Sequence, residues 1–188
     1  MHSPGVTLSP ASARGAGRDD AAPVRSERPV YAVRVTGKVE WRAAVAAGMA
    51  AGILATVVQV SLWFVLTDAL PEIFYRDARL AAAIVMGPGA LSPAGARAPV
   101  LLVATLVHFA LSIVYGVIVS WLAAGLGARA SLLAGAVFGV ALYALNMYGF
   151  TAIFPWFAAS RDGITLAAHI AFGVVAAGAY GVAARRRG

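Results

Sequence analysis

Four polar side chains are candidates for chemistry because each one interrupts a long apolar segment of the sequence. They are one glutamine, one asparagine and two histidines: Gln59, His108, Asn146 and His169. Polar and ionisable groups inside a membrane segment are rare and usually face the interior of a helix bundle. Counting about 1.5 Å per residue, all four lie roughly 6–12 Å below the same end of their segments. This pattern predicts one polar layer inside a bundle.

Two interpretations of the polar layer follow from its residue types. The first is interhelical hydrogen bonding, which contributes only about 0.6 kcal/mol per contact on average in membranes. The second is a polar cavity for a solute, a proton, a metal or a cofactor. A haem could be the cofactor in such a cavity, with one axial imidazole from each of His108 and His169. The segments lack the acidic or cysteine ligands of a zinc site, so we expect no metal and no resident cofactor.

The segments that must position these residues are long enough to cross a bilayer. About 20 helical residues span the roughly 30 Å of hydrocarbon. Four uncharged runs reach that length, and we predict a transmembrane helix in each: Ala43–Thr67, Val100–Leu122, Ala130–Phe150 and Ile164–Ala184. The predicted fold is an all-α membrane protein, a four-transmembrane-helix bundle over residues 39–188. It follows a disordered basic tail, residues 1–38.

The connections between these segments differ in length. Asp68–Pro99 contains several charged residues, and we predict a short interfacial helix over its apolar part, Leu80–Met86, ending at Gly87-Pro88-Gly89. Ala123–Arg129 is short, so the second and third segments should form an antiparallel hairpin. We expect each segment to be a helix without a break at mid-depth.

Composition and charge agree with a membrane protein. Hydrophobic residues make up 61% of the chain and charged residues only 12%, against about a quarter charged in soluble proteins. The net charge of +7 comes from residues outside the apolar runs, which indicates membrane topology rather than binding to nucleic acid. There is no cysteine, which excludes disulfides and thiolate sites.

The distribution of lysine and arginine predicts the orientation. Eleven of these residues fall on the side of the two termini, and only four fall on the other side: Arg76, Arg79, Arg97 and Arg161. The positive-inside rule then places both termini in the cytoplasm, and we expect the inner membrane of a bacterium.

Small residues recur at helical spacing in the same segments. They are Gly48 and Gly52 in the first, Ser112 and Gly116 in the second, and Gly135 and Gly139 in the third. Small residues four apart let helix backbones approach closely in lipid, so we predict that these positions pack against other helices. In addition, the pattern of Gly48, Gly52 and Gln59 recurs at a constant offset in Gly135, Gly139 and Asn146, which suggests an internal repeat.

The histidine in the second segment, the loop Phe154-Pro155-Trp156 and the histidine in the fourth segment resemble the YagU-like family of small bacterial inner-membrane proteins. The resemblance covers about Val100–Arg187 and implies a multi-span membrane protein without established enzymatic chemistry. The region from Asn146 to Phe157 also resembles short proteins that sometimes carry a sodium/proline symporter label. Such a symporter needs larger inverted repeats, which a chain of this length could supply only as a homo-oligomer.

No enzymatic site is evident. No set of nucleophile, base and orienting residue can be assembled, and no glycine-rich phosphate loop follows a strand. We therefore predict a non-enzymatic membrane protein whose partner is the lipid bilayer, with small-solute or cation transport, or haem binding, as alternatives.

Overall fold

The computed structural model describes residues 39–185, and all of them belong to one compact unit. Every regular element in this range is helical, with no strand. Four helical segments are long and apolar enough to cross a membrane: α1 (Trp41–Leu66), α3 (Arg97–Ala123), the segment Ala128–Ala152 that begins with α4, and α5 (Gly163–Arg185). The predicted all-α fold with four transmembrane helices is confirmed. The predicted disordered tail, residues 1–38, and residues 186–188 lie outside the described residues.

The outward faces of these helices are apolar and exposed. Ile53, Leu102 and Leu133 are 51%, 62% and 67% exposed, respectively. A surface of this kind would be unstable in water and is covered by hydrocarbon in a bilayer. The buried positions are instead mainly alanines and glycines, such as Ala44, Ala51 and Ala176. The protein is thus an integral membrane protein whose helices pack through small residues.

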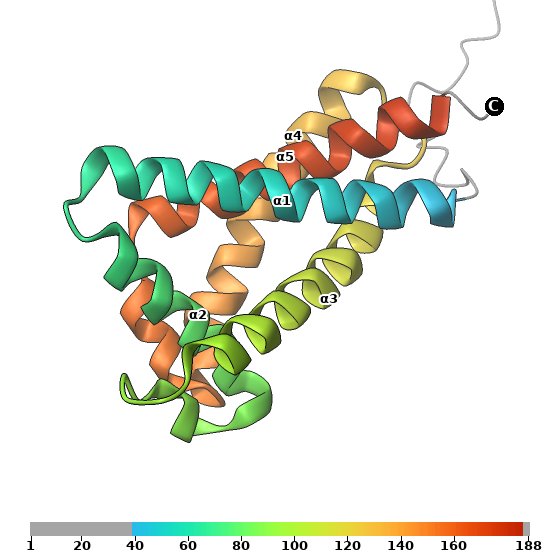
Figure 1. Ribbon diagram of the computed structural model, residues 1–188. Helices are drawn as coiled ribbons and strands as arrows, with labels where there is room; N and C mark the ends of the chain where they lie inside the picture. Colours follow the sequence, from blue (N-terminus) through green and yellow to red (C-terminus); the bar gives the residue numbers. More distant parts are fainter. Residues whose placement is uncertain (1–38, 186–188) are drawn as a thin grey trace, which may run out of the picture. The chain divides into compact units, whose positions relative to one another are not determined.

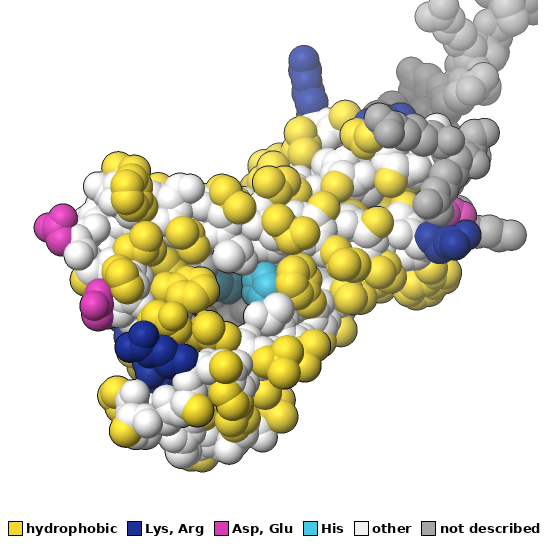
Figure 2. Space-filling view, in the orientation of Figure 1, with side chains coloured by type: hydrophobic (Ala, Val, Ile, Leu, Met, Phe, Trp, Pro, Cys, Tyr) yellow, Lys and Arg dark blue, Asp and Glu magenta, His cyan; other side chains and the backbone are white. Residues whose placement is uncertain are grey.

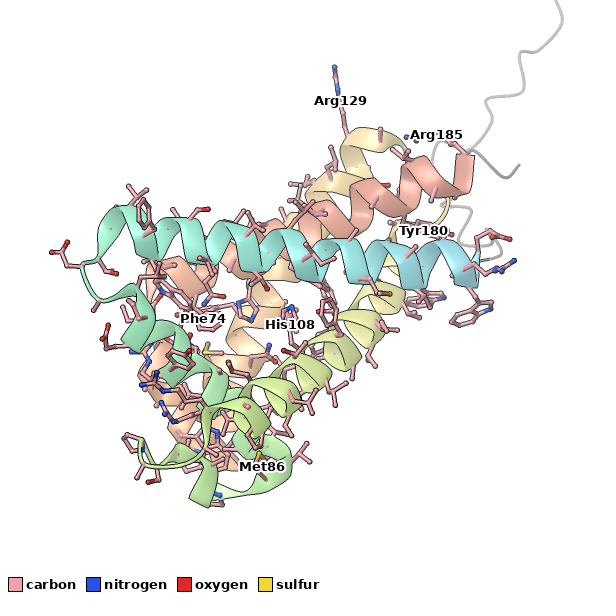
Figure 3. The ribbon with its side chains drawn as sticks, viewed as in Figure 1. Phe74, Met86, His108, Arg129, Tyr180 and Arg185 are labelled. Atoms are coloured by element: carbon pink, nitrogen blue, oxygen red, sulfur yellow. The ribbon has the colours of Figure 1, made fainter. Side chains whose placement is uncertain are left out.

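The helices are arranged around α1 and α5, as Figure 1 shows. α1 packs against α5 and α3, and α4 (Ala128–Ala144) packs mainly against α5. The short turn after α3, which contains Gly125 at φ 84°, joins α3 to α4. These two helices form the expected sequential hairpin, but each makes its main contacts with another helix. In Figure 3, Arg129, Tyr180 and Arg185 lie toward one end of the bundle and Phe74 and Met86 toward the other.

A further helix, α2 (Leu70–Met86), lies where α1 and α3 diverge (Figure 1). Proline in its first turn fits the helix start, and Gly87 ends it at φ 79°, a left-handed conformation that favours glycine. The short 3₁₀ helix η1 (Pro88–Leu91) follows. Ala78, Ala82 and Ala83 are buried in a cluster with two residues of α3. The interfacial helix expected over Leu80–Met86 is the second half of this longer helix.

The third span changes its helix type near its end. Its α-helical part ends at Ala144, and the chain continues as a π-helix, η2 (Leu145–Gly149), and two 3₁₀ helices, η3 (Phe150–Ala152) and η4 (Pro155–Ser160). The helix predicted over Ala130–Phe150 is therefore present as one helical segment, Ala128–Ala152, but its last turns have π and 3₁₀ geometry that the sequence did not predict. A π-turn displaces backbone groups from the α-helical hydrogen-bond pattern. Arg161 provides a hydrogen-bond partner for one of these groups, because its Nε donates to the Met147 carbonyl at 2.7 Å.

Candidate functional site: a polar cavity between the helices

The first element of the site is the crossing of α1 and α3. A Cβ atom added to Gly48 would lie 2.5 Å from the Ser112 carbonyl oxygen and 3.2 Å from the Gly116 Cα. A Cβ atom on Gly116 would meet the backbone of Gly48 in turn. The two backbones therefore touch, and only glycine fits at either position. Gly52, one turn later, lies against the side chains of Ser112 and His108.

The crossing of α4 and α5 is built in the same way. A Cβ atom added to Gly135 would meet the carbonyl of Gly173 and the Cβ of Ala177, the latter at 2.9 Å. A Cβ atom on Gly139 would meet the backbone of His169 and of Ile170. The predicted packing glycines of the third span thus face α5.

The two crossings correspond contact by contact. Gly48 contacts Ser112 and Gly116, while Gly135 contacts Gly173 and Ala177; Gly52 contacts His108, while Gly139 contacts His169. The glycines of the first helices are related by the constant offset of the sequence repeat, and their partners in the second helices are also separated by one constant offset. The α1–α3 and α4–α5 pairs are therefore two copies of one packing unit, and each contributes one histidine.

A cavity of about 870 Å³ lies between the two pairs. All five α-helices contribute to its lining, and most of the lining side chains are apolar. Figure 2 shows a hollow between α1 and α3 with a rim of hydrophobic side chains and a histidine at its base. The cavity thus opens sideways, on the surface that hydrocarbon covers.

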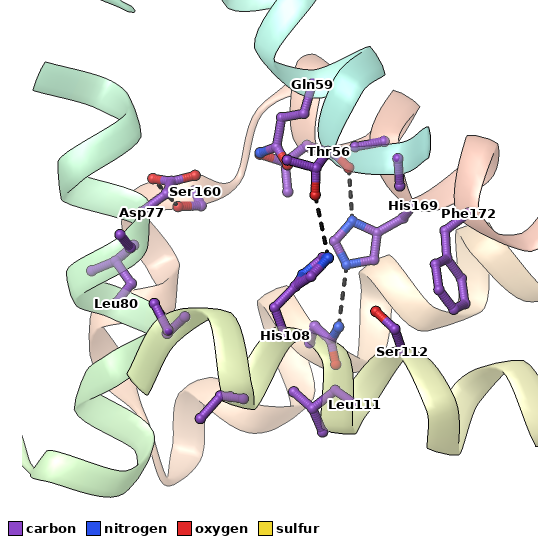
Figure 4. A pocket seen from close by; sticks show the side chains of 18 of the residues that line it. Thr56, Gln59, Asp77, Leu80, His108, Leu111, Ser112, Ser160, His169 and Phe172 are labelled. Carbon is purple, nitrogen blue, oxygen red and sulfur yellow. Dashed lines mark hydrogen bonds between the residues drawn. The ribbon is translucent and has the colours of Figure 1, made fainter. Parts of the chain in front are cut away.

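The four polar residues singled out in the sequence all line this cavity. Gln59 comes from α1, His108 from α3, Asn146 from η2 and His169 from α5. Figure 4 shows the two imidazole rings in the same space, with Gln59 and Thr56 beside them. The structure therefore brings together residues that are far apart in the chain.

His169 belongs to a complete chain of hydrogen bonds. Its Nδ1 lies 2.7 Å from the Thr165 carbonyl, which can only accept, so Nδ1 carries the proton. In the neutral ring, Nε2 then accepts from the Asn146 amide nitrogen at 3.2 Å. The Asn146 oxygen in turn accepts from the Tyr115 hydroxyl at 3.3 Å. This chain links α3, η2 and α5, and it occupies both nitrogens of His169.

His108 has only one of its nitrogens in use. Nε2 lies 3.3 Å from the Gly52 carbonyl and 3.2 Å from the Thr56 hydroxyl oxygen. Thr56 donates its own proton to the Gly52 carbonyl at 3.0 Å, so Nε2 is the donor to both oxygens. In the neutral ring, Nδ1 of His108 is then an acceptor, and it has no hydrogen-bond partner among residues 39–185.

Two further polar groups of the cavity have no partner in the described part of the chain. The Thr165 hydroxyl is buried without a hydrogen bond, and the residue is only 4% exposed. Gln59, which is half-buried, likewise forms no hydrogen bond with residues 39–185. Unmet polar groups in an apolar space are costly, so these groups mark where the cavity can accept a polar partner.

Asp77 of α2 is the charged side chain of the cavity lining. Its carboxylate pairs with the Arg76 guanidinium at 2.8 Å and accepts from the Ser160 hydroxyl at 3.3 Å. Burial raises the pKa of the Asp77 carboxyl, and the Arg76 charge and the hydrogen bonds from Arg76 and Ser160 partly oppose that rise. The negative charge is thus already compensated within α2 and η4.

The site also contains three residues outside the predicted set of four. Thr56 lies on the same helix face as Gly52 and Gln59, and this spacing was the available signal. Tyr115 and Thr165 share faces with His108 and His169, but nothing in the sequence indicates that one hydroxyl is bonded and the other is not.

Ligation of a haem by the two histidines would compete with hydrogen bonds that they already make. Nε2, the usual haem ligand atom, is bonded to Gly52 and Thr56 in His108 and to Asn146 in His169. Ligation would break both sets of hydrogen bonds. In addition, no group of three His, Cys, Asp or Glu residues suited to a metal ion occurs within residues 39–185.

Comparison with protein-family models, with curated proteins and with solved structures gives no match to this chain. Its function is therefore inferred from the geometry of the cavity.

Proposed function

We propose that this protein is a non-enzymatic protein of the bacterial inner membrane that binds a small, uncharged amphipathic molecule entering from the bilayer. The observation that carries the proposal is the set of unpartnered polar groups in an apolar, laterally open cavity. These groups are the Gln59 amide, Nδ1 of His108 and the Thr165 hydroxyl. A ligand that meets them recovers the cost of leaving them unmet.

The free groups define the chemistry of the ligand. Nδ1 of His108 accepts a hydrogen bond and so suits a hydroxyl group. The Thr165 hydroxyl and the Gln59 amide donate, and so suit a carbonyl or hydroxyl oxygen. Asp77 is already paired with Arg76, so no free charge attracts an ion. A neutral head with a hydroxyl and an oxygen acceptor, on a hydrocarbon tail, matches both the polar floor and the apolar walls.

The two packing units have different roles in this proposal. Gln59 and Asn146 are equivalent positions of the repeat, yet Asn146 bonds to His169 and Gln59 has no bond to His108. In the α4–α5 unit, both nitrogens of His169 are hydrogen-bonded within the protein, so this histidine has a structural role. In the α1–α3 unit, the Gln59 amide and Nδ1 of His108 have no partner in the described part of the chain, so they can bind the ligand.

Binding of 1-octanoylglycerol, a neutral amphiphile with two hydroxyls and an ester carbonyl, tests the proposal. Titration of the detergent-purified protein, followed by native mass spectrometry, should give a complex with the parent chain. Gln59→Leu and Thr165→Val should each weaken it about tenfold, because each removes one buried hydrogen bond.

Thr105→Val is the matched control. Its hydroxyl also belongs to a residue of the cavity lining, but it is already bonded to the Leu101 carbonyl at 2.7 Å. This variant should bind like the parent chain. The proposal fails if 1-octanoylglycerol does not bind, or if Gln59→Leu and Thr165→Val bind as tightly as Thr105→Val.

Cation-coupled transport has less support than binding of a neutral molecule. Sodium and similar hard cations prefer several oxygen ligands, including carboxylates. The cavity offers Asp77, which is held by Arg76 and Ser160. Kinship with the YagU-like family is a separate proposal that rests on the sequence resemblance alone. Trp156, from the loop in that resemblance, donates its indole N–H to the Leu80 carbonyl at 3.1 Å.

A further inference from the structure

We propose a second site, separate from the cavity, at which Arg79 and Arg97 bind the phosphate of an anionic phospholipid. Arg79 contacts the loop that leads into α3, and Arg97 is the first residue of α3 after that loop. Nη2 of Arg79 donates to the Pro93 carbonyl at 3.2 Å, and the Arg97 guanidinium lies 4.7 Å from the centre of the Tyr75 ring. Tyr75 and Arg79 are one turn apart on α2, so Arg97, which lies over the Tyr75 ring, is next to the face of α2 that carries Arg79.

Neither arginine has an acidic partner in the described part of the chain. The ion pair found within residues 39–185 joins Arg76 to Asp77, and the nearby acids Asp68 and Glu72 form none with Arg79 or Arg97. Nε of Arg79 is buried and donates to no acceptor in the structure. A buried guanidinium donor left without an acceptor is costly, and phosphate is the acceptor group that matches its geometry.

The start of α3 adds to the attraction for an anion. α3 begins at Arg97, and Ala96 before it provides no side-chain cap for the free backbone N–H groups. These groups and the helix dipole favour negative charge at this end. The dipole alone would not define a site, but here it adds to two unpaired guanidinium groups.

The surroundings indicate that the phosphate belongs to a lipid. The arginines lie at the end of a membrane span, where lipid headgroups are found. Leu102 and Leu106, each 62% exposed, continue along α3 from this end and can lie beside an acyl chain. Figure 2 shows basic side chains over α2 next to hydrophobic surface. A free phosphate ion would use the charges but not this apolar surface.

Native mass spectrometry of the full chain in mild detergent tests the site. We expect dioctanoyl phosphatidylglycerol to bind at least tenfold more tightly than dioctanoyl phosphatidylcholine, because the zwitterionic choline head carries no net negative charge. Arg79→Gln and Arg97→Gln should each weaken phosphatidylglycerol binding about tenfold. Arg97 is exposed, so its variant tests the site even if Arg79→Gln does not fold.

Arg129→Gln is the control, because it removes the same charge at the opposite end of the bundle (Figure 3). It should bind phosphatidylglycerol like the parent chain. Equal binding of the two lipids would overturn the proposal, as would an equal loss in Arg129→Gln and Arg97→Gln. Competition by inorganic phosphate at the concentration of the lipid would also overturn it, because a lipid site gains affinity from the acyl chains. If 1-octanoylglycerol does not bind in the cavity, the expected binding of phosphatidylglycerol is unchanged, because the two sites share no binding residue.

Discussion

Replacing Gly139 with alanine should loosen the crossing of α4 and α5. The added Cβ would lie 2.7 Å from the Ile170 Cα and 2.9 Å from the His169 carbonyl carbon. Both are backbone atoms, so no flexible side chain can move away and the helices must separate. Overpacking of this kind costs about 1–3 kcal/mol. Alanine recovers up to about 1 kcal/mol because it favours the helix over glycine. We therefore expect a net loss of roughly 1–2 kcal/mol.

Gly181→Ala is the matched substitution on α5. The nearest atom to its added Cβ is Nη1 of Arg185 at 3.7 Å, an ordinary contact with a flexible side chain. The higher helix propensity of alanine then decides the effect, and we expect the free energy of unfolding to rise by up to about 1 kcal/mol. Unfolding of both variants by dodecyl sulfate, followed by tryptophan fluorescence, measures the difference. If Gly139→Ala is as stable as the parent chain or as Gly181→Ala, the close approach at Gly139 does not hold the bundle together.

Three further predictions concern the loops and the topology. Burial raises the Asp77 pKa above its usual 3.8, so the folded state keeps a proton that the unfolded state loses. Stability should thus fall as the pH rises through that interval, and Asp77→Asn should remove this slope in unfolding midpoints measured against pH. Arg161→Gln should cost about 1–3 kcal/mol, because it frees the Met147 carbonyl that its Nε holds; a midpoint equal to that of the parent would show that η2 does not need this bond. Reporter fusions after Arg129 and at the C-terminus should indicate the cytoplasm and one at Gly95 the opposite side, whereas an external C-terminus would refute the orientation.

The helical framework could be predicted from the sequence because it depends on length and composition. Each span is an uncharged run of sufficient length, and the structure has a helix at each. The convergence of Gln59, His108, Asn146 and His169 on one space also follows from simple geometry. Each lies on the face of its helix that carries the small residues or continues from them, and close packing turns those faces inward.

The details that decide chemistry could not be predicted in this way. Nothing between Ala144 and Gly149 signals a π-helix, because the segment contains no proline and its apolar pattern continues. Its contact with Arg161 is equally hidden, because Arg161 follows it by several turns of chain and binds the Met147 carbonyl only in the folded protein. The packing of α2 beside the cavity could not be predicted either, since the sequence indicated only a short interfacial helix over Leu80–Met86. Only the folded arrangement shows that Asp77 is compensated locally.

The difference between the two packing units has its origin in the segments inserted within them. The helix crossings are equivalent, with glycine against backbone at Gly48 and at Gly135. The connection of α1 to α3 carries α2 and η1, whereas the connection after α4 carries η2, η3 and η4. The second insertion begins with the π-turn that contains Asn146, and there the amide reaches Nε2 of His169.

In the first unit, α1 remains α-helical through the equivalent position, and Gln59 is left without a partner beside His108. The insertion after α4 therefore supplies Asn146, which occupies Nε2 of His169. The insertion after α1 supplies α2, which lines the cavity but forms no hydrogen bond with Gln59 or with Nδ1 of His108. Of the two equivalent histidines, His169 thus has both nitrogens in hydrogen bonds, and His108 keeps one nitrogen for the ligand that we propose. Gln59→Asn would shorten the side chain and draw its amide back from the cavity, because α1 has no π-turn at this position. The variant should therefore bind 1-octanoylglycerol more weakly. The Tyr115–Asn146–His169 hydrogen bonds, and the stability that depends on them, should be unchanged.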